Sequence, residues 1–281
     1  MKNPKIEEKW IDTGRGKIFY YQNLSFANQP TVIFLHGLSS NHTTWLKIMK
    51  ELQDNQYNSL ALDIRGHGLS DKSKKKSFYK IAVLSEDLKK IIKKEKINKF
   101  IMVGYSFGGS IAIDYTIKNQ DSLAGLVLIS ANHTNPLEYK HLKFLTPFFT
   151  GTLNLLAYLL IWQKRKNYHY YQHSRAVGYW NSVIDGLQTM PISVNFWLLA
   201  NEFKINFKKE ISQIKISTVI IYSHKDSFIT KAEINDMAKA IFKSEIIISK
   251  NPNHFVGTNS QEEINQIILN FLKKTYENSN F

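Results

Sequence analysis

The chain has 281 residues, of which 43% are hydrophobic and 21% charged. This composition is typical of a globular protein and excludes general disorder and collagen-like repeats. The length allows one large domain or a domain that carries an insertion. The sequence contains no cysteine, which excludes a thiolate nucleophile, a cysteine zinc site, an iron–sulfur cluster and disulfide bonds.

The net charge is +14, from 37 basic and 23 acidic residues. Such a surplus suits nucleic acid, an anionic membrane surface or acidic substrates as partners, but the lysines are spread along the chain, which favours a generally basic surface. No recognition motif accompanies the charge, so we expect no nucleic-acid partner. The N-terminal residues lack the apolar segment of a secretion signal, and we expect a cytoplasmic protein.

Strand signals begin near the N-terminus. Residues 5–11 and 17–23 flank Thr13-Gly14-Arg15-Gly16, a pattern that predicts an antiparallel hairpin. Six short and mostly apolar segments follow, of the kind that lies between two helix layers in a parallel sheet. They are residues 31–35, 59–63, 100–103, 126–129, 218–222 and 245–249.

Helix signals fall between these strands. Residues 45–52, 79–94 and 110–117 predict helices, and capping boxes at Thr230–Glu233 and Ser260–Glu263 predict the starts of two more. Strand–helix alternation of this kind predicts an α/β fold. We expect a mostly parallel central sheet with an antiparallel N-terminal edge and helices on both faces.

The alternation is interrupted by an aromatic-rich stretch without strand signals. We interpret residues 136–207 as a helical cap inserted into a core formed by residues 1–135 and 208–281. Within the cap, residues 144–162 carry no charge, although Lys143 precedes them and Lys164-Arg165-Lys166 follows closely.

Pro147, Gly151 and Asn154 leave only residues 153–162 strongly apolar. This segment is too short to span a membrane, so we predict a buried or pocket-lining helix, with an interfacial patch as the alternative.

The most informative motif is Gly104-Tyr105-Ser106-Phe107-Gly108, between a predicted strand and a predicted helix. A G-x-S-x-G sequence in this context is a nucleophile elbow, a tight turn that presents the serine hydroxyl above the sheet edge. The turn also lies at a helix N-terminus, where free N–H groups favour developing negative charge. Ser106 is therefore the candidate nucleophile.

A serine nucleophile needs a base and an orienting carboxylate, which in this arrangement follow in the order acid, then histidine. Asp226 comes directly after the predicted strand 218–222, and His254 after the strand 245–249. The carboxyl ends of parallel strands meet at one edge of the sheet, so we expect the two side chains beside Ser106.

Two further segments complete a family pattern: His36-Gly37-Leu38 after the first parallel strand, and Asp63-Ile64-Arg65-Gly66-His67-Gly68-Leu69-Ser70. From about residue 17 to residue 272 the chain resembles the α/β-hydrolase fold superfamily, specifically its cap-bearing serine esterase and lipase-like branch. The resemblance implies an oxyanion hole formed by the backbone N–H groups of Leu38 and Phe107.

The chain departs from the family pattern at Ser223 and Asn253, where glycine is frequent in relatives, but neither change removes a catalytic group. Some relatives place the acid after the preceding core strand, where residues 130–133 offer no carboxylate. Asp226 therefore remains the predicted acid.

The resemblance also constrains the reaction. Relatives that open epoxides or displace halide use aspartate at the elbow, so Ser106 implies acyl chemistry without a metal or organic cofactor. We expect hydrolysis of carboxylic esters with apolar acyl or aromatic groups through an acyl-enzyme. Thioester or amide cleavage, carbon–carbon bond hydrolysis and a ligand-binding receptor with little turnover remain as alternatives.

The cap aromatics suggest an apolar substrate pocket, although they could equally form the core of the cap itself. Our expected substrate-binding residues are Leu156, Leu159, Tyr170 and Trp180. Four lysines follow the Asp63 segment and could border the same rim: Lys72, Lys74, Lys75 and Lys76. With the apolar cap they raise the hypothesis of weak association with an anionic membrane surface. The oligomeric state is left open.

Overall fold

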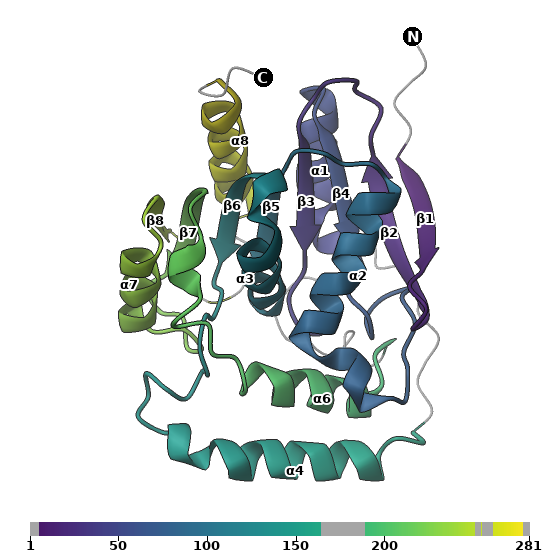
Figure 1. Cartoon of the computed structure of the whole chain (residues 1–281), viewed down its shortest axis with the longest axis vertical. Helices are drawn as coiled ribbons and strands as arrows, with labels where there is room; N and C mark the ends of the chain where they lie inside the picture. The colour runs from purple at the N-terminus through teal and green to yellow at the C-terminus, as the bar shows by residue number, and fades with distance from the viewer. Residues whose placement is uncertain (1–5, 164–188, 251–253, 255–260, 278–281) are drawn as a thin grey trace.

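The computed structural model describes residues 6–163, 189–250, 254 and 261–277 (Figure 1). In this part of the chain, eight strands form one sheet in the order β1-β2-β4-β3-β5-β6-β7-β8. The strands are β1 (Glu7–Asp12), β2 (Lys17–Asn23), β3 (Thr31–Leu35), β4 (Asn58–Leu62), β5 (Phe100–Tyr105), β6 (Leu123–Ile129), β7 (Ser217–Ser223) and β8 (Ser244–Ser249). The pairs β1–β2 and β2–β4 are antiparallel, and all other pairs are parallel. The expected parallel sheet with an antiparallel N-terminal edge is confirmed.

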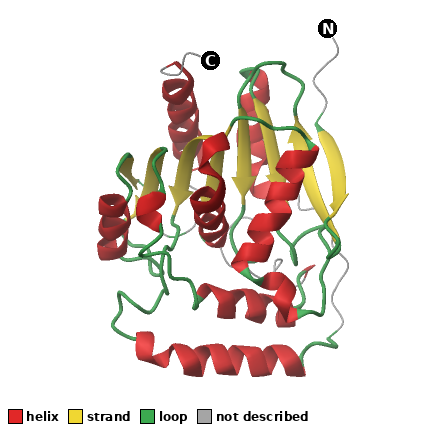
Figure 2. Ribbon diagram, in the orientation of Figure 1, coloured by secondary structure: helices red, strands yellow, loops and turns green. Residues whose placement is uncertain are grey.

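Helices cover both faces of the sheet (Figure 2). The helices α2 (Ile81–Lys94), α3 (Phe107–Asn119) and α7 (Lys231–Ala240) share one apolar cluster. The helices α1 (Leu46–Asp54) and α8 (Gln261–Glu277) share a second cluster on the other face. Short 3-10 helices are His42–Trp45, Lys76–Tyr79, Gln120–Ser122, Lys143–Leu145 and Ile211–Gln213.

The sequence patterns account for these helices. In α2 the buried side chains Leu84, Leu88 and Ile91 recur at the spacing of one helix face. The side chain of Thr230 accepts a hydrogen bond from Glu233 N and so caps α7, as predicted. Ser260, the other predicted cap, lies outside the described residues, but α8 begins at Gln261.

Two further helices lie between β6 and β7 in the chain: α4 (Thr146–Leu159) and α6 (Ile192–Glu202). Figure 1 shows α6 crossing beyond the carboxyl ends of the parallel strands, with α4 outermost. The inner face of α6 is buried, and its Trp197 ring stacks on Tyr79 with centroids 5.8 Å apart.

The prediction of a buried helix over residues 153–162 is wrong in one respect. The segment is largely helical, but Leu155, Tyr158 and Trp162 are exposed. A uniformly apolar segment has no polar face, so its pattern cannot say which side meets the protein. None of the helices in the described part of the chain combines the length and the apolarity needed to cross a membrane.

Candidate active site

Ser106 lies in a strained turn between β5 and α3. Its backbone has φ 49° and ψ −118°, a combination that non-glycine residues rarely adopt. The turn is held because Ser106 N donates to Ile129 O of β6 at 2.9 Å and Gly109 N donates to Ser106 O at 2.8 Å. The strain is thus maintained by the neighbouring strand and the first turn of α3, and it projects the hydroxyl at the carboxyl edge of the sheet.

The glycines of the elbow allow α3 to lie very close to the sheet. A Cβ atom on Gly108 would lie 2.5 Å from the carbonyl oxygens of Leu35 and His36. A Cβ atom on Gly104 would lie 2.7 Å from Gly109 Cα. These neighbours are backbone atoms of the central sheet and of the helix, so the glycines are required by close approach.

We expect Gly108→Ala to lower the free energy of unfolding by about 1–3 kcal/mol, because the added methyl group overpacks a backbone contact that cannot relax. Urea unfolding followed by circular dichroism measures this loss. Gly151→Ala on α4 is the matched control, since a Cβ there meets no atom within 4 Å. That variant should be unchanged or up to about 1 kcal/mol more stable; equal stability of the two variants would contradict the packing argument.

The structure brings Ser106, His254 and Asp226 into one hydrogen-bonded row. Ser106 Oγ lies 3.0 Å from His254 Nε2, and His254 Nδ1 lies 2.7 Å from Asp226 Oδ2. Ser106 follows β5, Asp226 follows β7 and His254 follows β8, so the three side chains come from strand ends at the same edge of the sheet. Neutral His254 that donates from Nδ1 to the carboxylate presents Nε2 as an acceptor for the serine hydroxyl.

Asp226 is held in place from two sides. Its Oδ1 accepts hydrogen bonds from Phe228 N at 2.8 Å and Ile229 N at 3.0 Å, and its Oδ2 faces His254. Burial raises the pKa of Asp226, but the hydrogen bond with His254 and those from the two backbone N–H groups outweigh burial and leave this pKa below its usual value. Asp226 is therefore an ionised, fixed acceptor at neutral pH.

The sequence did not indicate two aromatic neighbours of His254. The Tyr105 hydroxyl donates to His254 O at 3.2 Å. The Phe228 ring lies 4.9 Å from the imidazole, centroid to centroid. Tyr105 precedes Ser106 by one residue, and Phe228 follows Asp226 by two. This closeness in the sequence is the signal that could have indicated both aromatic residues.

The segment His36-Gly37-Leu38 lies beside Ser106. A Cβ atom on Gly37 would lie 3.0 Å from the Tyr105 ring and 3.5 Å from Ser106 Cβ. The backbone N–H of Ile64 donates to His36 Nε2 at 3.0 Å, so neutral His36 carries its proton on Nδ1 and donates to Gly37 O at 2.8 Å. Burial lowers the pKa of His36 to about 4, which keeps the ring neutral.

His36 therefore fixes the loop that precedes Leu38. Phe107 is the first residue of α3, where backbone N–H groups have no acceptor within the helix. Both predicted oxyanion donors thus belong to segments that flank Ser106.

Of the four predicted substrate-binding residues, the structure describes two. Leu156 and Leu159 lie on α4 and are 38% and 66% exposed, and the structure does not bring them to Ser106. Tyr170 and Trp180 lie outside the described residues. Lys72 Nζ donates to the carbonyl oxygens of Gly68 and Ser70, so it stabilises its own loop.

A cluster of buried acids behind the elbow was missed by sequence reasoning. Glu202 of α6 and Glu233 of α7 are both almost fully buried, and Asn132 lies between them. One end of the Asn132 amide lies 3.4 Å from Glu202 Oε1, and the other end lies 3.2 Å from both carboxyl oxygens of Glu233. An amide has one donating and one accepting end, so one of the two carboxyls must carry a proton to complete the contact.

The electrostatics agree with this geometry. Burial raises the pKa of Glu202 to about 7, despite hydrogen bonds from Asn132 and Ser110. Burial raises the pKa of Glu233 to about 8, and the negative charges of Glu202 and Asp226 add to the shift. A deprotonated Glu233 would thus place a second negative charge near Asp226.

These raised pKa values make stability depend on pH. The unfolded chain releases the Glu202 proton near pH 4.5, whereas the folded protein keeps it to about pH 7. The folded state binds more protons in that window, so the stabilisation is complete below pH 4.5 and is lost as the pH rises towards 7. Between pH 5 and 8 the wild type should lose about 2–3 kcal/mol relative to Glu202→Gln.

Urea unfolding at several pH values measures this difference. The control is Glu262→Gln, because Glu262 is exposed and its pKa is lowered by its hydrogen bond with Lys47. Its stability curve should run parallel to that of the wild type over the same range. A constant difference between wild type and Glu202→Gln would show that Glu202 is not protonated preferentially in the folded state.

Among the described residues, no three His, Asp or Glu side chains converge as a metal site would require. The groups that the structure places at this edge are a hydroxyl, an imidazole, a carboxylate and backbone N–H groups.

Comparison with known proteins identifies the class to which this fold and site belong. A model of the alpha/beta hydrolase fold family matches residues 30–257, and the chain belongs to this family. The chain is 24% identical over 285 residues to epoxide hydrolase 3 of Xenopus tropicalis, which covers 92% of this chain and 75% of that protein. It is 24% identical over 253 residues to the AB hydrolase superfamily protein YisY of Bacillus subtilis strain 168, covering 85% and 90%.

A solved esterase from Exiguobacterium antarcticum superposes with a TM-score of 0.73 at 17% identity, covering 95% of this chain and 100% of that chain. At this identity the similarity shows the fold alone.

Proposed function

We propose that this protein is a serine hydrolase that cleaves carboxylic esters with apolar acyl or aromatic groups through an acyl-enzyme. The hydrogen-bonded row of Ser106, His254 and Asp226 carries the proposal. A hydroxyl positioned on a neutral imidazole, which is itself oriented by a buried carboxylate, is the arrangement that activates serine for acyl transfer.

In the first step, His254 Nε2 takes the proton of Ser106 as Oγ attacks the ester carbonyl carbon. Asp226 holds the imidazole in the productive tautomer and stabilises its protonated form. The backbone N–H groups of Leu38 and Phe107 are the proposed donors to the oxyanion, each worth about 100- to 1,000-fold in rate. His254 then protonates the leaving alcohol, and water activated by the same base releases the acid.

Esters are favoured over epoxides by the chemistry of the intermediate. Attack of a serine hydroxyl on an epoxide carbon would form an ether, which has no carbonyl group for water to attack. An acyl-enzyme has such a carbonyl, and His254 is placed to activate water against it. A member of the family with serine at this position is therefore suited to turnover on acyl substrates, and carbon–carbon bond hydrolysis with the same triad is the second candidate.

Labelling with a fluorophosphonate probe tests the proposal. Wild-type protein should be labelled at Ser106, and Ser106→Ala should not. A panel of nitrophenyl esters of increasing acyl length then reports specificity, with a dienone-type carbon–carbon substrate measured in parallel. Absence of labelling in folded wild-type protein would contradict the serine hydrolase proposal, and efficient turnover of the dienone alone would select the second candidate.

A further inference from the structure

The helix α4 and its flanking residues present their largest apolar side chains to solvent. Six of these are between 60% and 78% exposed: Phe144, Phe148, Leu155, Tyr158, Leu159 and Trp162. We call these six residues the α4 outer face. The buried side chains of the helix, Thr150 and Ala157, are small. This is the reverse of an ordinary surface helix, which buries its large apolar side chains against the protein.

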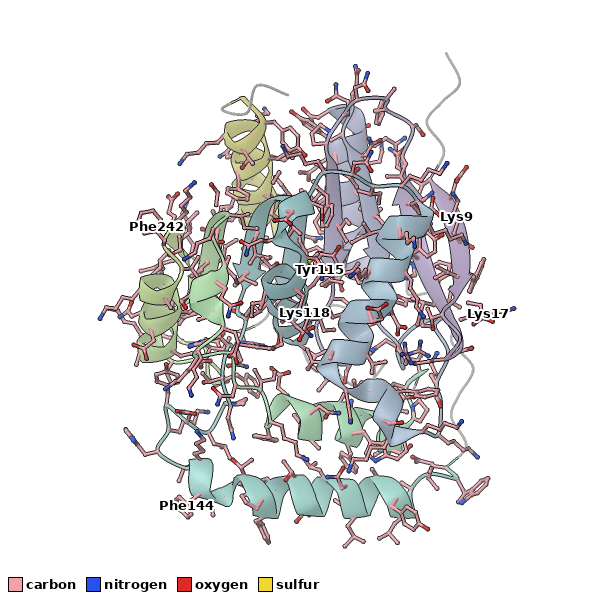
Figure 3. All side chains as sticks on the ribbon, in the orientation of Figure 1. Lys9, Lys17, Tyr115, Lys118, Phe144 and Phe242 are labelled. Carbon is pink, nitrogen blue, oxygen red and sulfur yellow. The ribbon has the colours of Figure 1, made fainter. Side chains whose placement is uncertain are left out.

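The outer face is a continuous stripe on the outermost element of the protein. Phe148, Leu155 and Leu159 of α4 follow one another at seven and four residues, spacings that align side chains on one side of a helix, while Phe144 precedes the helix and Trp162 follows it. Figure 1 shows α6 between α4 and the sheet, and Figure 3 shows Phe144 pointing away from the body of the protein. Large apolar side chains exposed together on a protein surface mark an interaction site.

The charges around the outer face are positive at both ends. Residues 144–162 contain no charged side chain. At the start of α4, Lys143 and Lys208 both contact the single acid Glu138 at 2.9 Å, which leaves one positive charge in excess. At the other end, Lys74 Nζ lies 3.5 Å from the centroid of the Trp162 ring.

From this combination we propose that the α4 outer face docks on the surface of an anionic phospholipid bilayer. Aromatic and aliphatic side chains enter the boundary between headgroups and acyl chains, while lysines contact the anionic headgroups. The 14 residues of α4 extend about 21 Å, which is less than the hydrocarbon thickness of about 30 Å, so the helix lies in the membrane plane. Docking in this orientation turns the carboxyl edge of the sheet, where Ser106 lies, towards the bilayer.

Vesicle co-sedimentation tests the proposal independently of catalysis. Wild-type protein should pellet with vesicles of mixed phosphatidylcholine and phosphatidylglycerol, and much less with pure phosphatidylcholine or at high salt. The triple variant Phe144→Ser, Phe148→Ser, Leu155→Ser should lower the partition coefficient by at least about 100-fold, because three apolar side chains no longer leave water. The double variant Lys74→Gln, Lys75→Gln should lower it about 10-fold or more, on anionic vesicles only.

Phe242→Ser is the matched control. Phe242 is 83% exposed and lies next to α7 and β8, far from α4 in Figure 3. This variant should bind vesicles as the wild type does. Circular dichroism and the melting temperature of each variant check that the fold is retained.

The proposal is overturned if wild-type protein does not pellet with anionic vesicles, or if the triple variant pellets as well as the wild type. An equal loss in Phe242→Ser would likewise show nonspecific apolar binding. The alternative partner of the α4 outer face is a second copy of the chain, and analytical ultracentrifugation tests this by measuring the oligomeric state. If the wild-type protein is a dimer that does not bind vesicles, and the triple variant is a monomer, the α4 outer face is a subunit interface instead.

Discussion

Ser106→Ala is expected to lower kcat/KM for ester hydrolysis by about 10⁴- to 10⁶-fold. The loss is this large because Ser106 Oγ is the proposed nucleophile and lies 3.0 Å from its base, His254 Nε2. Without it, the imidazole can act only on water held less favourably for attack. Steady-state kinetics on a nitrophenyl ester measures the loss, and circular dichroism verifies the fold.

Ser110→Ala provides a matched control one turn further along α3. Its hydroxyl contacts Asn132 O and Glu202 Oε1, both at 3.2 Å, and so faces away from His254. Its activity should remain within a few-fold of the wild type. Ester turnover that survives in Ser106→Ala but falls in Ser110→Ala would place the nucleophile elsewhere.

The parallel sheet could be predicted because its strands are short apolar segments. All six predicted segments match an observed strand to within three residues at each end, and the segment 31–35 coincides with β3. The strand ends are less accessible to this reasoning. β6, for example, begins three residues before the predicted segment, because Leu123 pairs with Phe100 of β5 before the register shifts to Ile101 and Gly125, a pairing that only the neighbouring strand defines.

The candidate site, too, could be predicted from the sequence only in part. Ser106, Asp226 and His254 could be proposed because each follows a strand signal, and parallel strands end at one edge. The Glu202–Asn132–Glu233 cluster could not be predicted in this way. Glu202 and Glu233 lie 70 and 101 residues after Asn132 in the chain, and the three side chains meet only through the packing of α6 and α7. Glu233 was predicted as a capping residue, yet its carboxylate accepts from His133 N at 3.3 Å. Local patterns describe the backbone of such a residue and leave its side-chain partners open.

Asp226→Asn is expected to lower kcat by about 10⁴-fold while leaving the fold intact. The backbone N–H groups of Phe228 and Ile229 hold Oδ1 at 2.8 and 3.0 Å, and they would retain the amide oxygen of asparagine in that position. The amide nitrogen would then face His254 Nδ1 and donate to it. This contact favours the imidazole tautomer with its proton on Nε2, which cannot accept the proton of Ser106.

A control variant and the value of KM separate this effect from a general disturbance of the site. Asp236→Asn on α7 removes a carboxylate whose partner is the Tyr139 hydroxyl, at 2.6 Å, and should leave kcat unchanged. In Asp226→Asn, KM should change little, because the lost contact acts on the tautomer of the base and makes no contact with bound substrate. Full activity of Asp226→Asn would mean that His254 does not need this carboxylate, and the orienting role would pass to another group near Nδ1.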